Sequence, residues 1–268
     1  MAETLQIPDE DAAWLSPHLP SESAIQSAGH QNRPFVTLTF ATSLDSSLSL
    51  APGVRTRLSG PESKAMTHYL RRQHAAILVG VGTVLADDPG LNCRIAGAGL
   101  DAQPRPVVLD PRGRWDFTEH SKVFEIARAG KGLAPFVLVG AAAIDSERQQ
   151  ILEAHGGKFV VLDTQKAEPR FDWPSILSVL HDEGLDSVMI EGGGQVINSL
   201  LRPEYHQLVD AVIVTLAPTW LGRGGVVVSP DRVHTSEGTP MPAARLADAA
   251  WHQFGEDIVL CGKLRRGD

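Results

Sequence analysis

Short apolar segments alternate with segments of helical character along most of this chain, and this alternation constrains the fold more than any other feature. Each apolar segment is rich in Val, Ile, Leu or Phe and is followed by a turn or a helix start, as buried strands are. Strands are predicted at residues 34–40, 76–79, 106–109, 136–139, 158–162 and 187–190. Helices are predicted at residues 61–74, 144–155, 173–183 and 195–201. This alternation predicts an α/β fold with a central, mostly parallel sheet flanked by helices.

The last quarter of the chain has a different pattern, because loops rather than long helices separate its apolar segments. Strands are predicted there at residues 211–216, 225–228 and 257–261. The short connections favour antiparallel strands at one edge of the sheet. No composition break marks a linker, so we expect one domain, residues 34–268. Residues 1–33 are interpreted as an N-terminal extension, in which Trp14, Leu15 and Leu19 could pack on the domain.

Composition excludes several classes of protein. The 268 residues are 43% hydrophobic and 21% charged, as in globular proteins with a sizeable core. No apolar run approaches the ~20 residues of a membrane span, and the N-terminus lacks the order of a signal peptide. A cytoplasmic protein without a membrane partner is therefore expected. The formal charge of −8 argues against a nucleic-acid partner, and with only two cysteines, far apart, neither a disulfide scaffold nor a metal site is expected.

A glycine-rich loop follows the predicted strand 187–190. Its sequence is Glu191-Gly192-Gly193-Gly194, and a helix begins directly after it. Glycines let a backbone approach a ligand closely, and the N–H groups of a helix start attract phosphate. A tight strand-to-helix turn alone would explain one or two of the glycines. Three glycines after a carboxylate favour a site for a phosphate or pyrophosphate.

A second loop, Gly80–Gly90, also follows a predicted buried strand. Leu85 stands where a dinucleotide-binding fingerprint requires its third glycine, so a Rossmann domain is not predicted. Thr83 and Asp87 could still reach a cofactor from the carboxyl end of the strand. A polar turn closed by an aspartate explains the same residues equally well.

Two further sets of polar residues are candidates for a binding site. Asp45 follows the first strand, where a carboxylate could bind amino or hydroxyl groups of a ligand, although such an aspartate more often caps a turn. Arg71 and Arg72 could bind phosphate, although basic residues in the last turns of a helix commonly complement its dipole. The run His181-Asp182-Glu183 matches half of a zinc deaminase signature, but no Pro-Cys-x-x-Cys follows it, so a deaminase is not predicted.

Several motifs recur in a fixed order between about residue 33 and residue 263. They occupy residues 34–45, 52–56, 66–71, 77–93, 187–193, 196–198 and 259–261. The most specific is the uninterrupted stretch 78–91. Together they resemble the fungal-type 2,5-diamino-6-ribosylamino-4(3H)-pyrimidinone 5′-phosphate reductases of riboflavin biosynthesis, which are related to the reductase half of a bacterial bifunctional deaminase-reductase.

This resemblance implies a dihydrofolate-reductase-like fold for one reductase domain, a homodimer, and NADPH as the donor that reduces the ribosylamino group to ribitylamino. The implied NADPH-binding residues are Gly80, Gly82, Thr83, Asp87, Gly192, Gly193, Gly194, Gln195 and Val196. The implied residues for the phosphorylated pyrimidine substrate are Asp45, Ser59, Arg71 and Glu191. Because opening of the sugar ring needs a proton on the ring oxygen, Asp45 and Glu191 are the predicted catalytic residues.

One departure from the family pattern concerns the substrate phosphate. Relatives commonly carry Lys or Arg two positions after the motif aspartate, where this chain has Ser47. If that residue binds phosphate, Arg55, Arg57 or Arg71 must replace it. Two alternatives stay open beside this reductase: an enzyme that reduces the deaminated pyrimidine, and a nucleotide-binding module without turnover.

Overall fold

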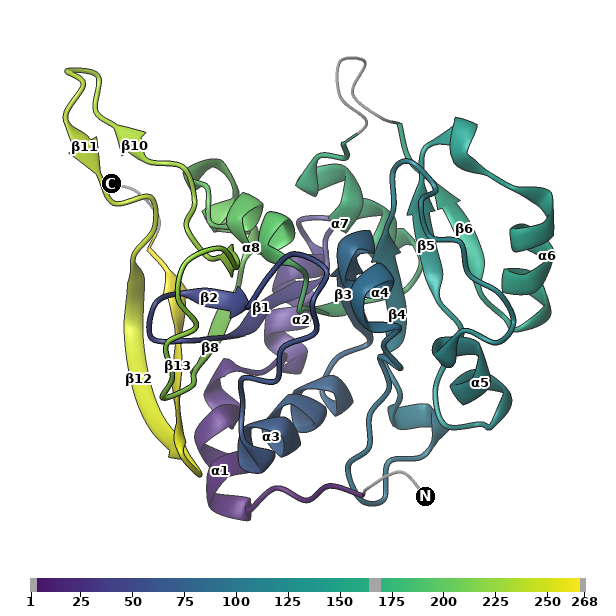
Figure 1. The fold of residues 1–268 in the computed structure, drawn as a ribbon, viewed down its shortest axis with the longest axis horizontal. Helices are drawn as coiled ribbons and strands as arrows, with labels where there is room; N and C mark the ends of the chain where they lie inside the picture. Colours follow the sequence, from purple (N-terminus) through teal and green to yellow (C-terminus); the bar gives the residue numbers. More distant parts are fainter. Residues whose placement is uncertain (1–3, 164–169, 266–268) are drawn as a thin grey trace.

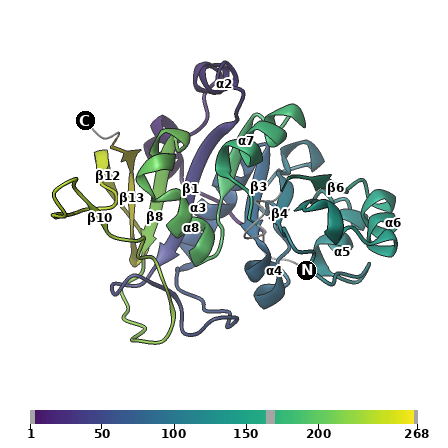
Figure 2. The same ribbon diagram turned by 90° about the horizontal axis from the view of Figure 1, so that it is seen from above.

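The structure is a computed structural model that describes residues 4–163 and 170–265 (Figure 1). Its main sheet has the strand order β12-β13-β8-β1-β7-β3-β4-β5-β6, and Figure 2 shows this row from β12 at the left to β6 at the right. The strands are β1 (Phe35–Thr42), β3 (Ala76–Gly80), β4 (Arg105–Leu109), β5 (Phe136–Val139), β6 (Lys158–Val161), β7 (Ser187–Ile190), β8 (Ala211–Leu216), β12 (Leu246–Phe254) and β13 (Asp257–Leu264). The strands from β8 to β6 are parallel to one another, whereas β13 is antiparallel to both β8 and β12.

Helices cover both faces of this sheet. They are α1 (Asp9–Leu15), α2 (Glu22–Gly29), α3 (Pro61–Arg72), α4 (Val81–Asp87), α5 (Lys122–Arg128), α6 (Ser146–Ala154), α7 (Trp173–Asp182) and α8 (Gly194–Leu200). Short 3-10 helices occupy Ser16–His18, Leu100–Ala102, Ala141–Ala143 and Pro203–Leu208. Within the described ranges, none of the helices is long and apolar enough to cross a membrane.

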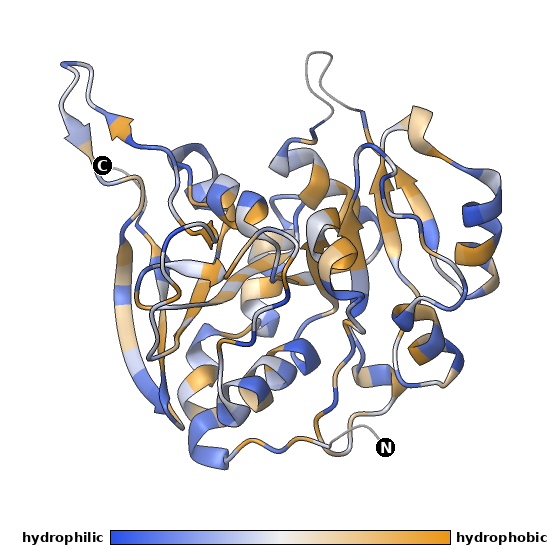
Figure 3. Cartoon of the chain, in the orientation of Figure 1, coloured by the Kyte–Doolittle hydropathy of each residue, from blue (hydrophilic) through white to orange (hydrophobic). Residues whose placement is uncertain are grey.

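Alternating side chains of the strands build separate cores on the two faces. Leu78 of β3 packs with α7 and α8 on one face, while Ile77 and Val79 pack with α4, α5 and α6 on the other. Since side chains of a strand alternate between faces, a sheet covered on both sides needs continuous apolar strands. Figure 3 shows this concentration of hydrophobic residues in the central strands. The run of apolar residues in each strand is therefore explained by burial on both faces.

The α/β part agrees with the sequence prediction. All six predicted strands between residues 34 and 190 are present, as are the four predicted helices, and every end lies within two residues of the prediction. Helix ends follow local signals. The carboxylate of Asp172 accepts from the N–H of Ser175 at 3.0 Å at the start of α7, and Gly184 takes a φ of 73° just after it ends. The mostly parallel sheet and the antiparallel C-terminal strand are confirmed.

Predictions for the C-terminal strands are wrong in three respects. β8 is parallel to β1 rather than antiparallel, because α8 and the 3-10 helix at 203–208 carry the chain back over the sheet before β8 begins. β9 (Val226–Val227) pairs with β2 (Ser47–Ser49) in a separate two-stranded sheet. β12 was not predicted, because it is an edge strand in which most residues are exposed or half-buried. A further ribbon, β10 (Val233–His234) with β11 (Pro240–Met241), extends from the body at the upper left of Figure 1.

The segment 80–90, predicted as a loop, contains the helix α4. Its first residues alternate glycine with valine, which obscures helical periodicity over seven residues. Val81 and Val84, one turn apart, are both buried against the sheet. The helix ends at Asp87, and its C-cap residue Asp88 takes a left-handed φ of 40°. The candidate residues Gly82, Thr83 and Asp87 therefore lie on a short helix.

The N-terminal residues pack on the sheet face that carries α3. Leu15 is fully buried with Met66 and Leu70 of α3, and Trp14 and Leu19 pack on the same cluster. The prediction that these three residues of the first 33 contact the body is confirmed.

Candidate active site

The two glycine-bearing segments meet at the carboxyl end of the sheet. β3 and β7 are neighbouring parallel strands, so the residues that follow them lie side by side. A Cβ placed on Gly80 would lie 3.1 Å from Cγ2 of Val196, and one on Gly193 would lie 3.4 Å from Oγ1 of Thr83. Four of the predicted cofactor residues, from segments more than 100 residues apart, are thus brought together.

Helices α4 and α8 both begin here with a glycine N-cap. The N-caps are Gly80 and Gly193, and neither helix start has a side-chain capping hydrogen bond. The first N–H groups of a helix have no partner within it, so such ends can donate to an anionic ligand. Gly82 lies in the first turn of α4, and a Cβ there would meet no protein atom within 4 Å. Gln195 is exposed in the first turn of α8.

Two of the three consecutive glycines have a reason within the protein. A Cβ on Gly194 would lie 2.5 Å from Cγ1 of Val226, and one on Gly192 would lie 2.4 Å from Cγ1 of Val196. At distances below 3 Å a neighbouring atom must shift, so the packing of Val226 and Val196 against the backbone favours glycine at both positions. Of the three, only Gly193 faces Thr83 without such a clash. The triple glycine is therefore partly a packing motif.

Asp87 ends α4 with an unused acceptor. Its Oδ1 is buried and has no hydrogen-bond partner among the described residues. The next residue, Asp88, accepts from the backbone N–H of Lys122 at 3.2 and 3.3 Å, at the start of α5. A buried acceptor without a partner costs free energy unless a ligand or water donates to it. Asp88 thus holds the start of α5, whereas the buried Oδ1 of Asp87 is left without a partner among the described residues.

An ion pair links the glycine loop to α3. Arg71 donates to Oε1 of Glu191 at 3.1 Å from its Nε and to Oε2 at 2.8 Å from its Nη2. A third bond from Arg71 reaches the carbonyl of Asn92 at 3.1 Å. The side chains are 14% and 19% exposed, so this bidentate pair is largely shielded from water. Two predicted substrate residues are therefore in direct contact.

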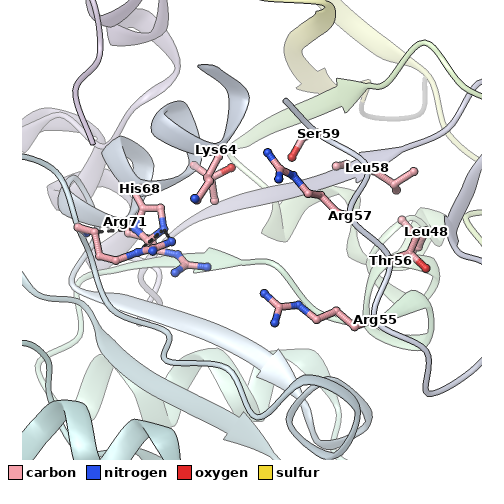
Figure 4. Close-up of a pocket in the computed structure, with 12 residues that line it drawn as sticks. Leu48, Arg55, Thr56, Arg57, Leu58, Ser59, Lys64, His68 and Arg71 are labelled. Carbon is pink, nitrogen blue, oxygen red and sulfur yellow. Dashed lines mark hydrogen bonds between the residues drawn. The ribbon is translucent and has the colours of Figure 1, made fainter. Parts of the chain in front are cut away.

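Arg71 also lines a cavity of about 560 Å³. Figure 4 shows Arg55 and Arg57 extending from one side toward Lys64, His68 and Arg71 of α3 on the other. The lining consists of Ala41, Leu48, Arg55, Thr56, Arg57, Leu58, Ser59, Lys64, Thr67, His68, Arg71 and Arg94. It contains five cationic side chains and, within the part of the chain described, no carboxylate. We call this cavity the cationic pocket.

The pocket brings together the residues proposed for phosphate and several that were not. Arg55, Arg57 and Arg71, the predicted replacements for a basic residue at Ser47, all line it, and so does Ser59. Lys64 and Arg94 were not predicted. Lys64 lies seven residues before Arg71 on α3, a helical spacing that places both on one face and could have identified it. Arg94 reaches the pocket only through the tertiary fold, and no local sequence pattern identifies it.

His68 is a neutral base within the cationic pocket. Its Nδ1 accepts from the N–H of Arg94 at 3.1 Å, and its Nε2 lies 2.8 Å from Nη2 of the same residue. Burial, and then the charges of Arg71, Arg94 and Lys64, lower the pKa of His68 to about 2. The positive field that lowers this pKa would also attract an anion.

Asp45 lies outside the lining of the cationic pocket, as far as the described residues define it. Its carboxylate accepts from the hydroxyl of Ser43 and from the N–H groups of Leu221 at 3.1 Å and Gly222 at 2.7 Å. These bonds, that from Ser43 first, lower the pKa of Asp45 below its ordinary value. The residue ties the turn after β1 to the loop after β8, and the structure does not bring it into contact with Glu191.

Comparisons with known proteins agree on one family. Residues 34–260 match the model of the RibD C-terminal domain. The 2,5-diamino-6-ribosylamino-4(3H)-pyrimidinone 5′-phosphate reductase of Debaryomyces hansenii is 43% identical over 236 residues, covering 87% of this chain and 90% of that protein. The enzyme of the same name from Saccharomyces cerevisiae is 39% identical over 232 residues, covering 86% and 87%. The solved structure of the Saccharomyces riboflavin biosynthesis reductase Rib7 is similar with a TM-score of 0.75 and 34% identity, covering 96% of this chain and 100% of that one.

Proposed function

Because the chain belongs to the RibD C-terminal domain family, we propose that it reduces 2,5-diamino-6-ribosylamino-4(3H)-pyrimidinone 5′-phosphate to the ribitylamino product. The observation that carries the proposal is the Arg71–Glu191 ion pair, because it joins the glycine segments to the cationic pocket. The glycine segments, on the Glu191 side of the pair, suit a dinucleotide. The cationic pocket, on the Arg71 side, suits a sugar phosphate. A reductase needs both ligands to meet at one place.

The substrate phosphate is assigned to the cationic pocket. Guanidinium groups bind phosphate through paired charge-assisted hydrogen bonds. Arg55 and Arg57 reach the pocket from one side and Arg71 from the other, so a phosphate between them replaces mutual repulsion with attraction. Ser59 supplies a hydroxyl to the same lining. This assignment also accounts for Ser47, since the absent basic side chain is replaced by arginines from other segments.

The dinucleotide is assigned to the glycine segments, and NADPH is our choice of cofactor. The uncapped starts of α4 and α8 would donate N–H groups to its phosphates, with Thr83 and Gly193 at their contact. The buried Oδ1 of Asp87, which has no partner among the described residues, would accept from a donor of the ligand. These features fit such a ligand. When bound, NADPH supplies the hydride for C1′ of the opened sugar.

Glu191 and Asp45 take different parts in this proposal. Glu191 is the candidate to hold or move a proton at the ring oxygen, and both its oxygens now accept from Arg71. A phosphate that draws Arg71 toward it would release one of these oxygens. Asp45 is already occupied by three donors, which favours a role in positioning the loop around Leu221.

We further propose a cytoplasmic homodimer. The outer face of the C-terminal strands exposes Trp251 and Ile258, at 59% and 47%, on neighbouring strands at the edge of the sheet. Large exposed apolar side chains at a sheet edge are typical of a surface that another chain covers. Sedimentation of the wild type and of Trp251→Glu tests the dimer, which predicts a shift of the variant to the monomer. Fractionation of cells tests the location.

The reaction itself is tested by following NADPH oxidation at its absorbance band. The diamino substrate and its deaminated counterpart are assayed in parallel, each with NADPH and with NADH. We expect rapid oxidation with the diamino substrate and NADPH. Faster oxidation with the deaminated pyrimidine would indicate an enzyme that reduces that compound instead. NADPH binding without oxidation in the presence of either substrate would indicate a nucleotide-binding module without turnover.

A further inference from the structure

The N-terminal segment is bonded to one wall of the cationic pocket. Leu5 forms an isolated parallel β-bridge with Ile95. The N–H of Leu5 donates to the carbonyl of Arg94 at 2.9 Å, and the carbonyl of Leu5 accepts from the N–H of Ala96 at 2.8 Å. The backbone of a single residue thus holds the strip 92–96 on one side.

The Leu5 side chain reinforces this contact. It is 5% exposed and packs with Cys93 and Ile95 of the strip and with Ala65 of α3. Burial of this apolar side chain stabilises the contact between the surfaces that it joins. Leu5 therefore fills the junction between the strip and the helix that supplies three cationic or imidazole groups to the pocket.

On its other side, the same strip contacts the side chains of the pocket. Arg71 donates to the carbonyl of Asn92 at 3.1 Å. The guanidinium of Arg94 lies against His68, with Nη2 2.8 Å from Nε2. A shift of the strip by a fraction of a bond length would therefore alter the placement of Arg94, His68 and Arg71 together.

The N-terminal segment is anchored at its far end as well. His252 of β12 lies 2.8 Å from the carboxylate of Asp11, and the ring of Trp14 stacks on that of His252 with centroids 5.0 Å apart. Leu15 is fully buried just beyond. Residues 5–15 therefore run between two fixed points, the pocket wall and the C-terminal strands, and they lie outside residues 34–260 that match the family.

We propose that Leu5 is a positioning residue for substrate binding, acting through the strip 92–96 on Arg94 and Arg71. The proposal rests on the assignment of the substrate phosphate to the cationic pocket. It predicts that a defect at Leu5 weakens binding of the sugar phosphate and leaves the glycine segments, on the other side of the Arg71–Glu191 pair, unaffected.

The test compares Leu5→Pro with Gln6→Pro. Proline at position 5 removes the N–H that donates to Arg94, whereas Gln6 is exposed and its N–H is not part of the bridge. Ribose 5-phosphate binding is measured by calorimetry, beside NADPH affinity, the melting temperature, KM and kcat. For Leu5→Pro we expect ~5-fold weaker ribose 5-phosphate binding and a similar rise in KM, with kcat and NADPH affinity within about twofold of the wild type.

Two further variants separate loss of the Leu5 contacts from a general loss of stability. Leu5→Ile retains the bridge and most of the packing and is expected to behave as the wild type. If Leu5→Pro does not fold, Leu5→Ala replaces it, with an expected loss of ~3-fold in ribose 5-phosphate affinity. The proposal is overturned by unchanged ribose 5-phosphate affinity, by an equal loss in Gln6→Pro, or by a parallel loss of NADPH affinity, which would indicate general loosening.

Failure of the proposed reaction is distinguishable from failure of this inference. A wild type that binds ribose 5-phosphate but oxidises no NADPH would reject the reaction. Selective weakening of that binding in Leu5→Pro would still support the positioning role. A wild type that does not bind ribose 5-phosphate would overturn the positioning role.

Discussion

The two halves of the candidate site are built in opposite ways. The glycine segments are continuous runs of sequence that follow two neighbouring parallel strands, so the pairing of β3 with β7 brings both segments to one edge of the sheet. The cationic pocket gathers Arg55, Lys64, Arg71 and Arg94 from three separate segments, and Leu5 supports its wall. The first half depends on the sheet and the second on packing between loops and a helix. The two halves should therefore respond separately to mutation.

The largest expected effect is at the ion pair that joins them. Arg71→Ala removes a phosphate candidate and leaves Glu191 half-buried without its partner, so we expect kcat/KM to fall by ~100-fold or more. Steady-state kinetics measures this. Arg72→Ala is the matched control, because Arg72 is the next residue on α3 but is exposed and lies outside the pocket lining. Equal losses in the two variants would contradict the assignment.

A smaller effect separates the cofactor half. Gly82→Ala adds a Cβ that meets no protein atom within 4 Å, and alanine favours a helix, so the melting temperature should not fall. A ligand that approaches the start of α4 would meet this methyl, so we expect NADPH affinity to fall by ~10-fold while ribose 5-phosphate binding stays unchanged. Fluorescence titration with NADPH measures this. Unchanged affinity would exclude close approach of the cofactor at Gly82.

Acid is expected to lower the folding stability of the domain that carries both halves of the site, through protonation of His74. This residue is buried between the carbonyl of Leu70 and the hydroxyl of Thr37, both at 2.7 Å, and burial lowers its pKa from 6.5 to about 4. Below pH 6.5 the unfolded chain binds the proton first, so stability falls with pH until about pH 4. The loss amounts to ~3 kcal/mol. Denaturant unfolding between pH 7 and 4 measures it, and His74→Gln should have a flatter profile.

The smallest expected effect is at Asp45. Asp45→Asn keeps a side-chain oxygen that can accept from the loop around Gly222, so we expect kcat within about threefold of the wild type. Glu191→Gln, measured under the same conditions, is expected to lower kcat by at least ~10-fold. A drop in Asp45→Asn as large as that in Glu191→Gln would restore Asp45 as a proton donor and reject its positioning role.

Much of the fold could be predicted from local patterns. The strands β3, β4, β5 and β7 are largely apolar and buried, and a parallel sheet covered on both faces is the arrangement that buries such strands. The errors lie where this signal fails. Most residues of β12 are exposed or half-buried at an edge, and α4 is a single short helix that begins with Val81 and Gly82 after its N-cap Gly80. The direction of β8 depends on the path of the preceding helix, which no local pattern records.

In the candidate site, too, some features follow from local sequence patterns and others only from tertiary packing. The sequence by itself determined which residues follow the buried strands, and hence that Gly80, Thr83, Gly193 and Glu191 would lie at one edge of the sheet. Tertiary structure alone decided that Arg71 pairs with Glu191, that Arg94 lies against His68, and that Leu5 bonds to the strip 92–96. The physical reason is that strand register follows from short-range periodicity, whereas contacts between a helix, a loop and an N-terminal segment depend on how those elements pack.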